Sequence, residues 1–146
     1  MRLLLITMML VFGSLFTTST ANAQRNIVTS VKKGIASFYH DKFVGRKTST
    51  GEVFSNNKFT AASNTLKLGT YAKVTNLKNG RYVYVKINDR MAKTNSRLID
   101  LTKIAATRLN FTNQGLTQVK VEPVSPAVGK RGIIAQSGTT VNRNIL

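Results

Sequence analysis

Two runs of alternating apolar and polar residues, separated by the dipeptide Asn79-Gly80, constrain this chain more than any other feature of its sequence. The runs cover residues 71–77 and 81–87 and are rich in β-branched and aromatic residues, which favour strands. Asn-Gly tolerates positive φ at both central positions of a type I′ turn. The pattern therefore predicts a tight antiparallel hairpin, and with it a domain built on a sheet.

The predicted turn also fixes the register of the hairpin, because Lys78 then faces Arg81. On the mostly apolar face this register pairs Val74 with Val85, Ala72 with Ile87 and Asn76 with Val83. On the other face it sets Lys73 opposite Lys86, and like charges directly opposite are unfavourable. Either the two long side chains splay into solvent, or they form a small cationic strip that meets an anionic polymer.

Two further segments predict strands, and a third predicts a helix. Residues 31–39 are rich in β-branched and aromatic residues, and residues 116–124 alternate, with Val119 and Val121 on one side. Between them lies a short helix for which Asp100 or Thr102 is the expected cap. Its apolar stripe consists of Leu101, Ile104, Ala105 and Leu109.

Many short strands with closely spaced turn signals indicate an all-β fold, a small closed barrel with one or two short helices. We expect a short lead at residues 24–33, the barrel at 34–124 and a disordered tail at 125–146, with residues 133–135 as an alternative edge strand. The expected core residues are Val74, Val83, Val85, Ile87, Val119 and Val121.

Residues 1–23 have the layout of a secretory signal peptide. Arg2 precedes an apolar stretch, and Ala21-Asn22-Ala23 supplies a cleavage site before Gln24. A membrane anchor is the alternative, but spanning a bilayer takes roughly 18 or more apolar residues. We therefore expect export to the periplasm or the exterior without stable membrane insertion. We also expect a soluble form, because the chain has no cysteine to carry a lipid anchor.

The chain is strongly basic, with 22 lysines and arginines against 5 acids and a formal net charge of +17. Cleavage after residue 23 leaves 21 cations and a charge of +16. This balance predicts attraction to polyanions such as nucleic acid, acidic lipid or the carboxylates and phosphates of a cell envelope. Export favours the envelope. We expect no nucleic-acid partner, because neither an aromatic-basic RNA motif nor a helix-turn-helix pattern is visible.

Five acids restrict the chemistry that the chain can perform. Cleavage of a glycosidic bond needs a carboxyl group, and hydrolases normally use two. A lytic transglycosylase needs only one, because the 6-hydroxyl of the muramoyl sugar attacks its own anomeric carbon. Glu52 lies in a polar loop and Asp89 at the end of the second hairpin strand, both suitable for a cleft. From spacing alone, an ordinary turn acid is the favoured interpretation of each.

Two other titratable residues have simpler interpretations. Asp100 is expected to cap the helix or to form an ion pair with Arg97. His40 is the only histidine and cannot make a metal site alone, and no carboxylate cluster with ligand spacing accompanies it. We therefore expect no metal and no cofactor.

A series of motifs between residues 34 and 124 resembles the RlpA (rare lipoprotein A) family. The first half of the series is Gly34-Ile35-Ala36-Ser37-Phe38-Tyr39, Gly45-Arg46, Thr48, Gly51-Glu52, Ala61-Ala62, Thr65-Leu66, Gly69-Thr70-Tyr71 and Val74-Thr75-Asn76. The second half is Asn79-Gly80-Arg81, Val83, Val85, Ile87-Asn88-Asp89-Arg90, Arg97-Leu98-Ile99-Asp100-Leu101 and Ala105-Ala106. So many motifs in one order make the resemblance specific.

The resemblance implies a fold, an activity and a pair of site residues. The family has a small six-stranded double-psi β-barrel, related to expansins and to a class of membrane-bound lytic transglycosylases. Its active members resemble endolytic lytic transglycosylases, which cut glycan strands stripped of their stem peptides. The functional glutamate and aspartate of the family fall on Glu52 and Asp89.

The chain departs from the family pattern at two histidine positions. Where the family has Ala-Ala-His, this chain has Ala61-Ala62-Ser63, and Val44 stands where a histidine often precedes Gly-Arg. Serine can donate a hydrogen bond but, unlike histidine, cannot take up a proton and become charged near neutral pH.

Two main hypotheses follow. In the first, the protein is a secreted lytic transglycosylase of peptidoglycan glycan strands in which Asp89 is the acid and base and Glu52 assists. Asp89 then has to be protonated, so its pKa must be raised by burial and by the nearby Glu52. In the second, it is a non-catalytic, expansin-like module that binds peptidoglycan. The expected substrate-binding residues are Ser63, Arg90, Tyr39 and Arg46.

Overall fold

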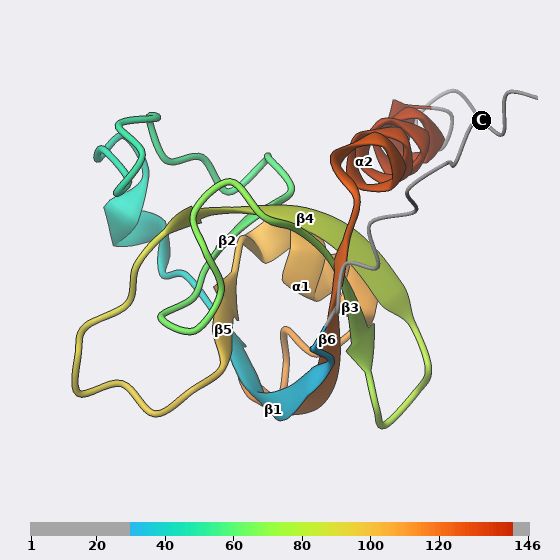
Figure 1. The fold of residues 1–146 in the computed structure, drawn as a ribbon, viewed down its shortest axis with the longest axis horizontal. Coiled ribbons are helices and arrows are strands. Elements are labelled where there is room, and N and C mark those ends of the chain that lie inside the picture. Colours follow the sequence, from blue (N-terminus) through green and yellow to red (C-terminus); the bar gives the residue numbers. More distant parts are fainter. Residues whose placement is uncertain (1–29, 142–146) are drawn as a thin grey trace, which may run out of the picture.

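The computed structural model describes residues 30–141. Six strands form a closed barrel in the order β1-β5-β2-β4-β3-β6, and the chain passes through β1, η1, β2, β3, β4, β5, α1, β6 and α2 (Figure 1). The β1–β5 and β2–β4 pairs are parallel and the other pairs antiparallel. The predicted all-β barrel is confirmed. The element bounds are β1 Lys32–Phe38, η1 Asp41–Phe43, β2 Thr60–Ala62, β3 Tyr71–Asn76, β4 Tyr82–Asp89, β5 Ile99–Leu101, α1 Lys103–Leu109, β6 Thr117–Val124 and α2 Pro126–Val141.

The barrel interior contains the residues that the alternation predicted. All six expected core residues, Val74, Val83, Val85, Ile87, Val119 and Val121, have no exposed surface. Alternate residues of a strand point to the same face, so one apolar set per strand is enough to fill a small barrel. The first strand begins at Lys32, so the expected lead at 24–33 overlaps the barrel by two residues.

The hairpin register that we predicted is wrong. Val74 pairs with Val83 and Ala72 with Val85, so each β3 residue faces a partner two positions earlier than expected. Because strand side chains repeat every two residues, this shift leaves the buried faces unchanged. Lys73 therefore faces Tyr84 instead of Lys86, and the predicted opposition of like charges does not occur.

The side chain of Asn76 explains the shift. Its Oδ1 accepts hydrogen bonds from the Lys78 N–H and from Thr117, and its Nδ2 donates to the Leu109 carbonyl. The Leu77 N–H donates to Gln118 of β6, so Leu77 does not extend the hairpin ladder. The turn is therefore a longer loop over residues 77–80, in which Gly80 alone has positive φ, at 72°.

The predicted short helix is present, with Thr102 as its N-cap residue and Asn110 at its end. Asn110 has the left-handed conformation, with φ 57°, that commonly ends a helix. The Thr102 hydroxyl makes no cap hydrogen bond and donates instead to the Lys58 carbonyl. Thr102 thus ties the start of α1 to the segment before β2.

The expectation of a disordered tail is wrong for residues 126–141, which form α2 over the outside of β4 and β3 (Figure 1). The ladder between β2 and β4 begins at Lys86. The backbone of Tyr84 therefore has no strand partner on the side of β4 that faces β2. Gln136 takes the place of a strand, because its amide accepts from the Tyr84 N–H and donates to the Tyr84 carbonyl. The alternative edge strand at 133–135 is likewise replaced by helix.

Two glycines bring α2 close to the barrel. A Cβ at Gly129 would overlap Tyr71, and a Cβ at Gly132 would overlap Tyr84. Sequence patterns treat glycine in this segment as a helix breaker, whereas here its missing side chain is what allows the contact.

We expect Gly132→Ala to loosen α2, because the new methyl group overlaps the Tyr84 ring and overpacking of this kind costs about 1–3 kcal/mol. Gly138→Ala is the matched control, since nothing lies within 4 Å of a Cβ there. Hydrogen exchange of residues 126–138 should be faster in Gly132→Ala and unchanged or slower in Gly138→Ala. Equal protection in both variants and the parent would contradict the proposed close contact.

Candidate active site

A cleft of about 480 Å³ lies beside the barrel, where β1 and β4 end and β5 begins. Its lining residues come from the segment around η1 and from the loop between β4 and β5. Figure 1 shows these two segments on the other side of the view from α2. Its size is typical of a ligand site. Of the predicted site residues, Tyr39, Asp89 and Arg90 line this cleft.

Asp89 lines this cleft, and both of its carboxylate oxygens accept hydrogen bonds. The carboxylate accepts four hydrogen bonds, from the Tyr39 hydroxyl at 2.7 Å, the Ser49 N–H and hydroxyl at 2.9 and 2.8 Å, and the Arg90 N–H at 2.8 Å. Burial, the largest influence, raises the pKa, but the hydrogen bonds together outweigh it and leave the pKa of Asp89 below its ordinary value. The side chain is therefore ionised at neutral pH.

This result corrects the expectation that Asp89 has a raised pKa. The expected cause included a nearby Glu52, but the hydrogen bonds and ion pair of Glu52 are made to other groups. Its carboxylate accepts from Asn88 at 3.1 Å and pairs with Lys86 at 3.3 Å. The hydrogen bond from Asn88 is the largest influence on its pKa, which is also lowered. Glu52 does not line the cleft that contains Asp89.

Glu52 and Asp89 are nevertheless connected through one loop. Glu52 and Ser49 belong to the same loop after η1, and the loop is closed by a bridge between Lys47 and Val53. The Asn88 side chain donates a hydrogen bond to Glu52, and the Asp89 carboxylate accepts one from the Ser49 hydroxyl. Two consecutive residues of β4 thus anchor the loop, and Glu52 fixes the position of the serine that binds Asp89.

Tyr39, the residue directly after β1, is the second side-chain partner of Asp89. Burial, and then the hydrogen bond to Asp89, raise the pKa of Tyr39 strongly, so its hydroxyl stays protonated and donates. The ring packs against Phe54 at 4.4 Å and against Phe43 at 5.8 Å between centroids. Two phenylalanine rings therefore fix the tyrosine whose hydroxyl faces the carboxylate.

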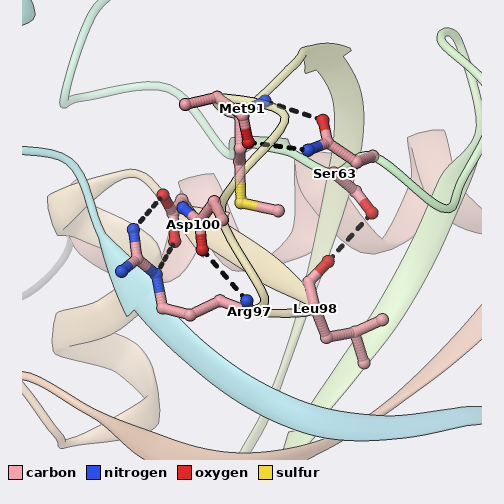
Figure 2. A network of polar contacts seen from close by, with 8 residues as sticks. Ser63, Met91, Arg97, Leu98 and Asp100 are labelled. Carbon is pink, nitrogen blue, oxygen red and sulfur yellow. Dashed lines mark hydrogen bonds and ion pairs between the residues drawn. The ribbon is translucent and has the colours of Figure 1, made fainter.

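Ser63 does not line the cleft, contrary to our prediction. Its side chain has no exposed surface, and its hydroxyl donates to the Leu98 carbonyl at 2.9 Å (Figure 2). Arg90 does border the cleft, but its guanidinium donates to the carbonyls of Ser63 and Leu66. Ser63 therefore connects the segment after β2 to Leu98, and Arg90 connects the same segment to the end of β4.

The remaining residues that the sequence singled out make structural contacts, some of them outside the cleft. Arg97 and Asp100 form the expected ion pair, with N···O distances of 2.7 and 2.9 Å, and both line the cleft (Figure 2). Arg46 lies over the Phe43 ring, 5.6 Å from its centroid, and does not line the cleft. Within residues 30–141, no group of three or more His, Asp and Glu side chains comes together in a way that could hold a metal ion.

Sequence reasoning missed two residues of this site. Ser49 provides two of the hydrogen bonds to Asp89, and nothing in a polar loop distinguishes it from its neighbours. His40 lines the cleft with Asp89. Its position directly after Tyr39 could have indicated this, because the residues at the end of β1 line the cleft.

Comparison with known proteins decides the family. A family model described as lytic transglycolase matches residues 31–121. The chain belongs to this lytic transglycolase family. The resemblance to RlpA proteins that its motifs indicated is confirmed.

Relatives of this lytic transglycolase domain include RlpA proteins of two bacteria. The chain is 42% identical over 127 residues to "Endolytic peptidoglycan transglycosylase RlpA" of Haemophilus influenzae, a match to 87% of this chain and 42% of the relative. It is 45% identical over 103 residues to the protein of the same name from Neisseria meningitidis serogroup A, covering 70% of this chain and 43% of the relative. The chain spans less than half the length of these curated relatives.

The lytic transglycolase domain also shares its fold with an expansin. A mutant of Clavibacter michiganensis expansin in complex with cellohexaose superposes with a TM-score of 0.52 and 19% identity, over 65% of this chain and 50% of the other. At this level of identity the comparison bears on the fold alone, and it agrees with the predicted double-psi barrel. Within the described residues, no helix is long and apolar enough to cross a membrane.

Proposed function

We propose that this protein is an exported lytic transglycosylase that cuts the glycan strands of peptidoglycan. The observation that carries the proposal is Asp89, an ionised carboxylate that accepts hydrogen bonds from Tyr39, Ser49 and the Arg90 N–H in the wall of a cleft. The RlpA names of its relatives support the same activity and substrate.

The lowered pKa of Asp89 fits this reaction if the carboxylate acts first as a base. Lytic cleavage transfers no net proton, because the hydrogen that leaves O6 of the muramoyl sugar ends on O4 of the departing sugar. In one displacement, O6 bonds to the anomeric carbon while the C1–O4 bond breaks, and Asp89 takes the O6 proton and passes it to the departing O4. Until it has taken up the O6 proton, the carboxylate also stabilises the positive charge that develops on the sugar ring. This order reverses the acid-first sequence that we expected.

In this mechanism Glu52 is a positioning residue. It binds Lys86 and Asn88 and so fixes the loop that brings Ser49 to Asp89. Tyr39 and Ser49 orient the carboxylate directly. Residues 1–23, proposed to be a signal peptide that directs export, lie outside the described residues.

Digestion of purified sacculi tests this function directly. Intact sacculi and sacculi stripped of stem peptides would be incubated with the protein, and the released fragments analysed by mass spectrometry. We expect 1,6-anhydromuramoyl ends, mainly from stripped glycan. Reducing ends would instead indicate a hydrolase.

A second candidate function is an expansin-like module that binds peptidoglycan without cutting it. The buried Ser63 favours it, because the chain has no histidine at this family position and the serine does not reach the cleft. Sedimentation of the protein with sacculi, without release of any fragment, would support this candidate over the transglycosylase.

Binding to sacculi is expected to weaken with salt. Lys78 and Arg81 are exposed, whereas Lys86 pairs with Glu52 and Lys73 lies 4.3 Å over the Tyr82 ring. Exposed charges are screened beyond roughly 8 Å at physiological ionic strength. Raising salt should therefore lower the sedimented fraction, and Lys78→Gln with Arg81→Gln should reduce the salt effect. Binding that is unchanged at high salt would place the affinity in the cleft instead.

A further inference from the structure

His40 stands in the cleft wall as a polar group that the proposed mechanism does not use. It follows Tyr39 directly and borders the same cleft as Asp89. Its side chain is exposed and makes one hydrogen bond, in which Nδ1 accepts the Lys42 N–H at 3.2 Å. Within residues 30–141, Nε2 makes no hydrogen bond to the protein.

That one hydrogen bond determines which nitrogen of the neutral ring carries the proton. A nitrogen that accepts a hydrogen bond has no hydrogen of its own, so the proton of the neutral imidazole is on Nε2. Nε2 is therefore a hydrogen-bond donor that is free to bind a ligand. The ring is anchored by the same contact, since Lys42 belongs to the short helix η1 that His40 precedes.

Apolar side chains accompany this donor in the cleft. Phe43, Met91 and Ala92 line it together with His40. The cleft therefore offers the His40 N–H donor and apolar lining, besides the polar Lys42 and Asn95. Such a combination suits a group that joins a carbonyl oxygen to a methyl group. The acetamido group of an N-acetylated sugar has this combination.

We propose that His40, Phe43, Met91 and Ala92 form a subsite for the acetamido group of an N-acetylated sugar. The Nε2–H of His40 donates to the acetamido carbonyl oxygen, and the methyl group contacts the apolar side chains. The subsite rests on the proposed function, because it names the part of the glycan that the cleft recognises. His40 binds substrate in this proposal and transfers no proton.

Two substitutions separate this role from a structural one. His40→Asn keeps an acceptor close to the position of Nδ1, and asparagine is a good helix cap, but the distal donor is lost. His40→Gln keeps a donor close to the position of Nε2 and loses the cap. The dissociation constant for stripped glycan strands, together with KM and kcat where cutting occurs, would be measured for both variants.

We expect His40→Asn to weaken glycan binding by about three- to tenfold, the usual effect of one neutral hydrogen bond. His40→Gln should retain most of the affinity, and kcat should change little in either variant. The reverse order, with His40→Asn unchanged and His40→Gln impaired, would mean that His40 only caps η1 and would overturn the proposal. Loss of kcat in both variants would make His40 a proton carrier and would also overturn it.

The sugar itself supplies the second comparison. The parent protein should bind fully N-acetylated strands about three- to tenfold more tightly than chemically N-deacetylated ones, and His40→Asn should reduce this preference. A preference that is equal in both proteins would overturn the subsite and leave the proposed function intact. If the parent protein neither binds nor cuts glycan, the proposed function fails and the subsite fails with it.

Discussion

Asp89→Asn is expected to lower the release of 1,6-anhydromuramoyl fragments by about a thousandfold or more. An amide can neither take the O6 proton nor stabilise a cationic sugar ring by charge, and general acid–base catalysis alone typically contributes 10²–10⁴-fold. The new side chain has nearly the same shape. Its oxygen can still accept from the Ser49 and Arg90 N–H groups that now bind the carboxylate.

The controls for this variant are folding and binding. Its near-ultraviolet circular dichroism and its sedimentation with stripped sacculi should match those of the parent protein, because the cleft keeps its walls. Fragment release equal to that of the parent would exclude Asp89 as the proton carrier. Intact binding with no release by either protein would identify the chain as a binding module.

The alternation of apolar residues was sufficient to predict the barrel and its core. Val74 and Val83 are buried whichever partner they face, because burial depends on the face of the strand and not on the register. The register depended on a turn, and the turn depended on the Asn76 side chain. Its partners on Leu109 and Thr117 lie more than 30 residues away, so no local pattern could reveal them.

The carboxyl-terminal segment shows a second reason why the sequence alone could not predict the whole fold. Residues 126–141 have few strong helix signals and several glycines, which predicts disorder in an isolated segment. The helix is stabilised by contact with the barrel, where Gly132 fits against Tyr84 and Gln136 binds the Tyr84 backbone. Packing in three dimensions therefore reverses a local preference.

In the site, the family motifs singled out Asp89 and Tyr39, which line the same cleft, but did not give the sign of the shift in the Asp89 pKa. Burial and hydrogen bonds act on the pKa of Asp89 in opposite directions, and the outcome depends on how many donors reach the carboxylate. Ser49 contributes two of them from a loop of ordinary sequence. Likewise, only the structure shows that the Ser63 hydroxyl points to Leu98 and not into the cleft.

Tyr39→Phe is expected to shift the acid limb of the pH profile upward. The Tyr39 hydroxyl is the largest of the hydrogen-bonding influences that lower the pKa of Asp89, so its removal brings that pKa up. If Asp89 has to be ionised to act first as a base, activity is lost as the pH falls through its pKa. The loss should therefore begin at a higher pH in Tyr39→Phe than in the parent protein.

The same substitution should lower activity at neutral pH by about ten- to a hundredfold, since hydrogen bonds to charged groups contribute roughly 1.5–3 kcal/mol and this one orients the carboxylate. The ring and its contacts with Phe43 and Phe54 remain, so folding should be preserved. Initial rates between pH 3 and 8 on stripped glycan measure both effects. If activity instead rises as the pH falls toward the pKa of Asp89, the protonated carboxyl is the active form. The base-first mechanism would then have to be abandoned in favour of an acid-first one.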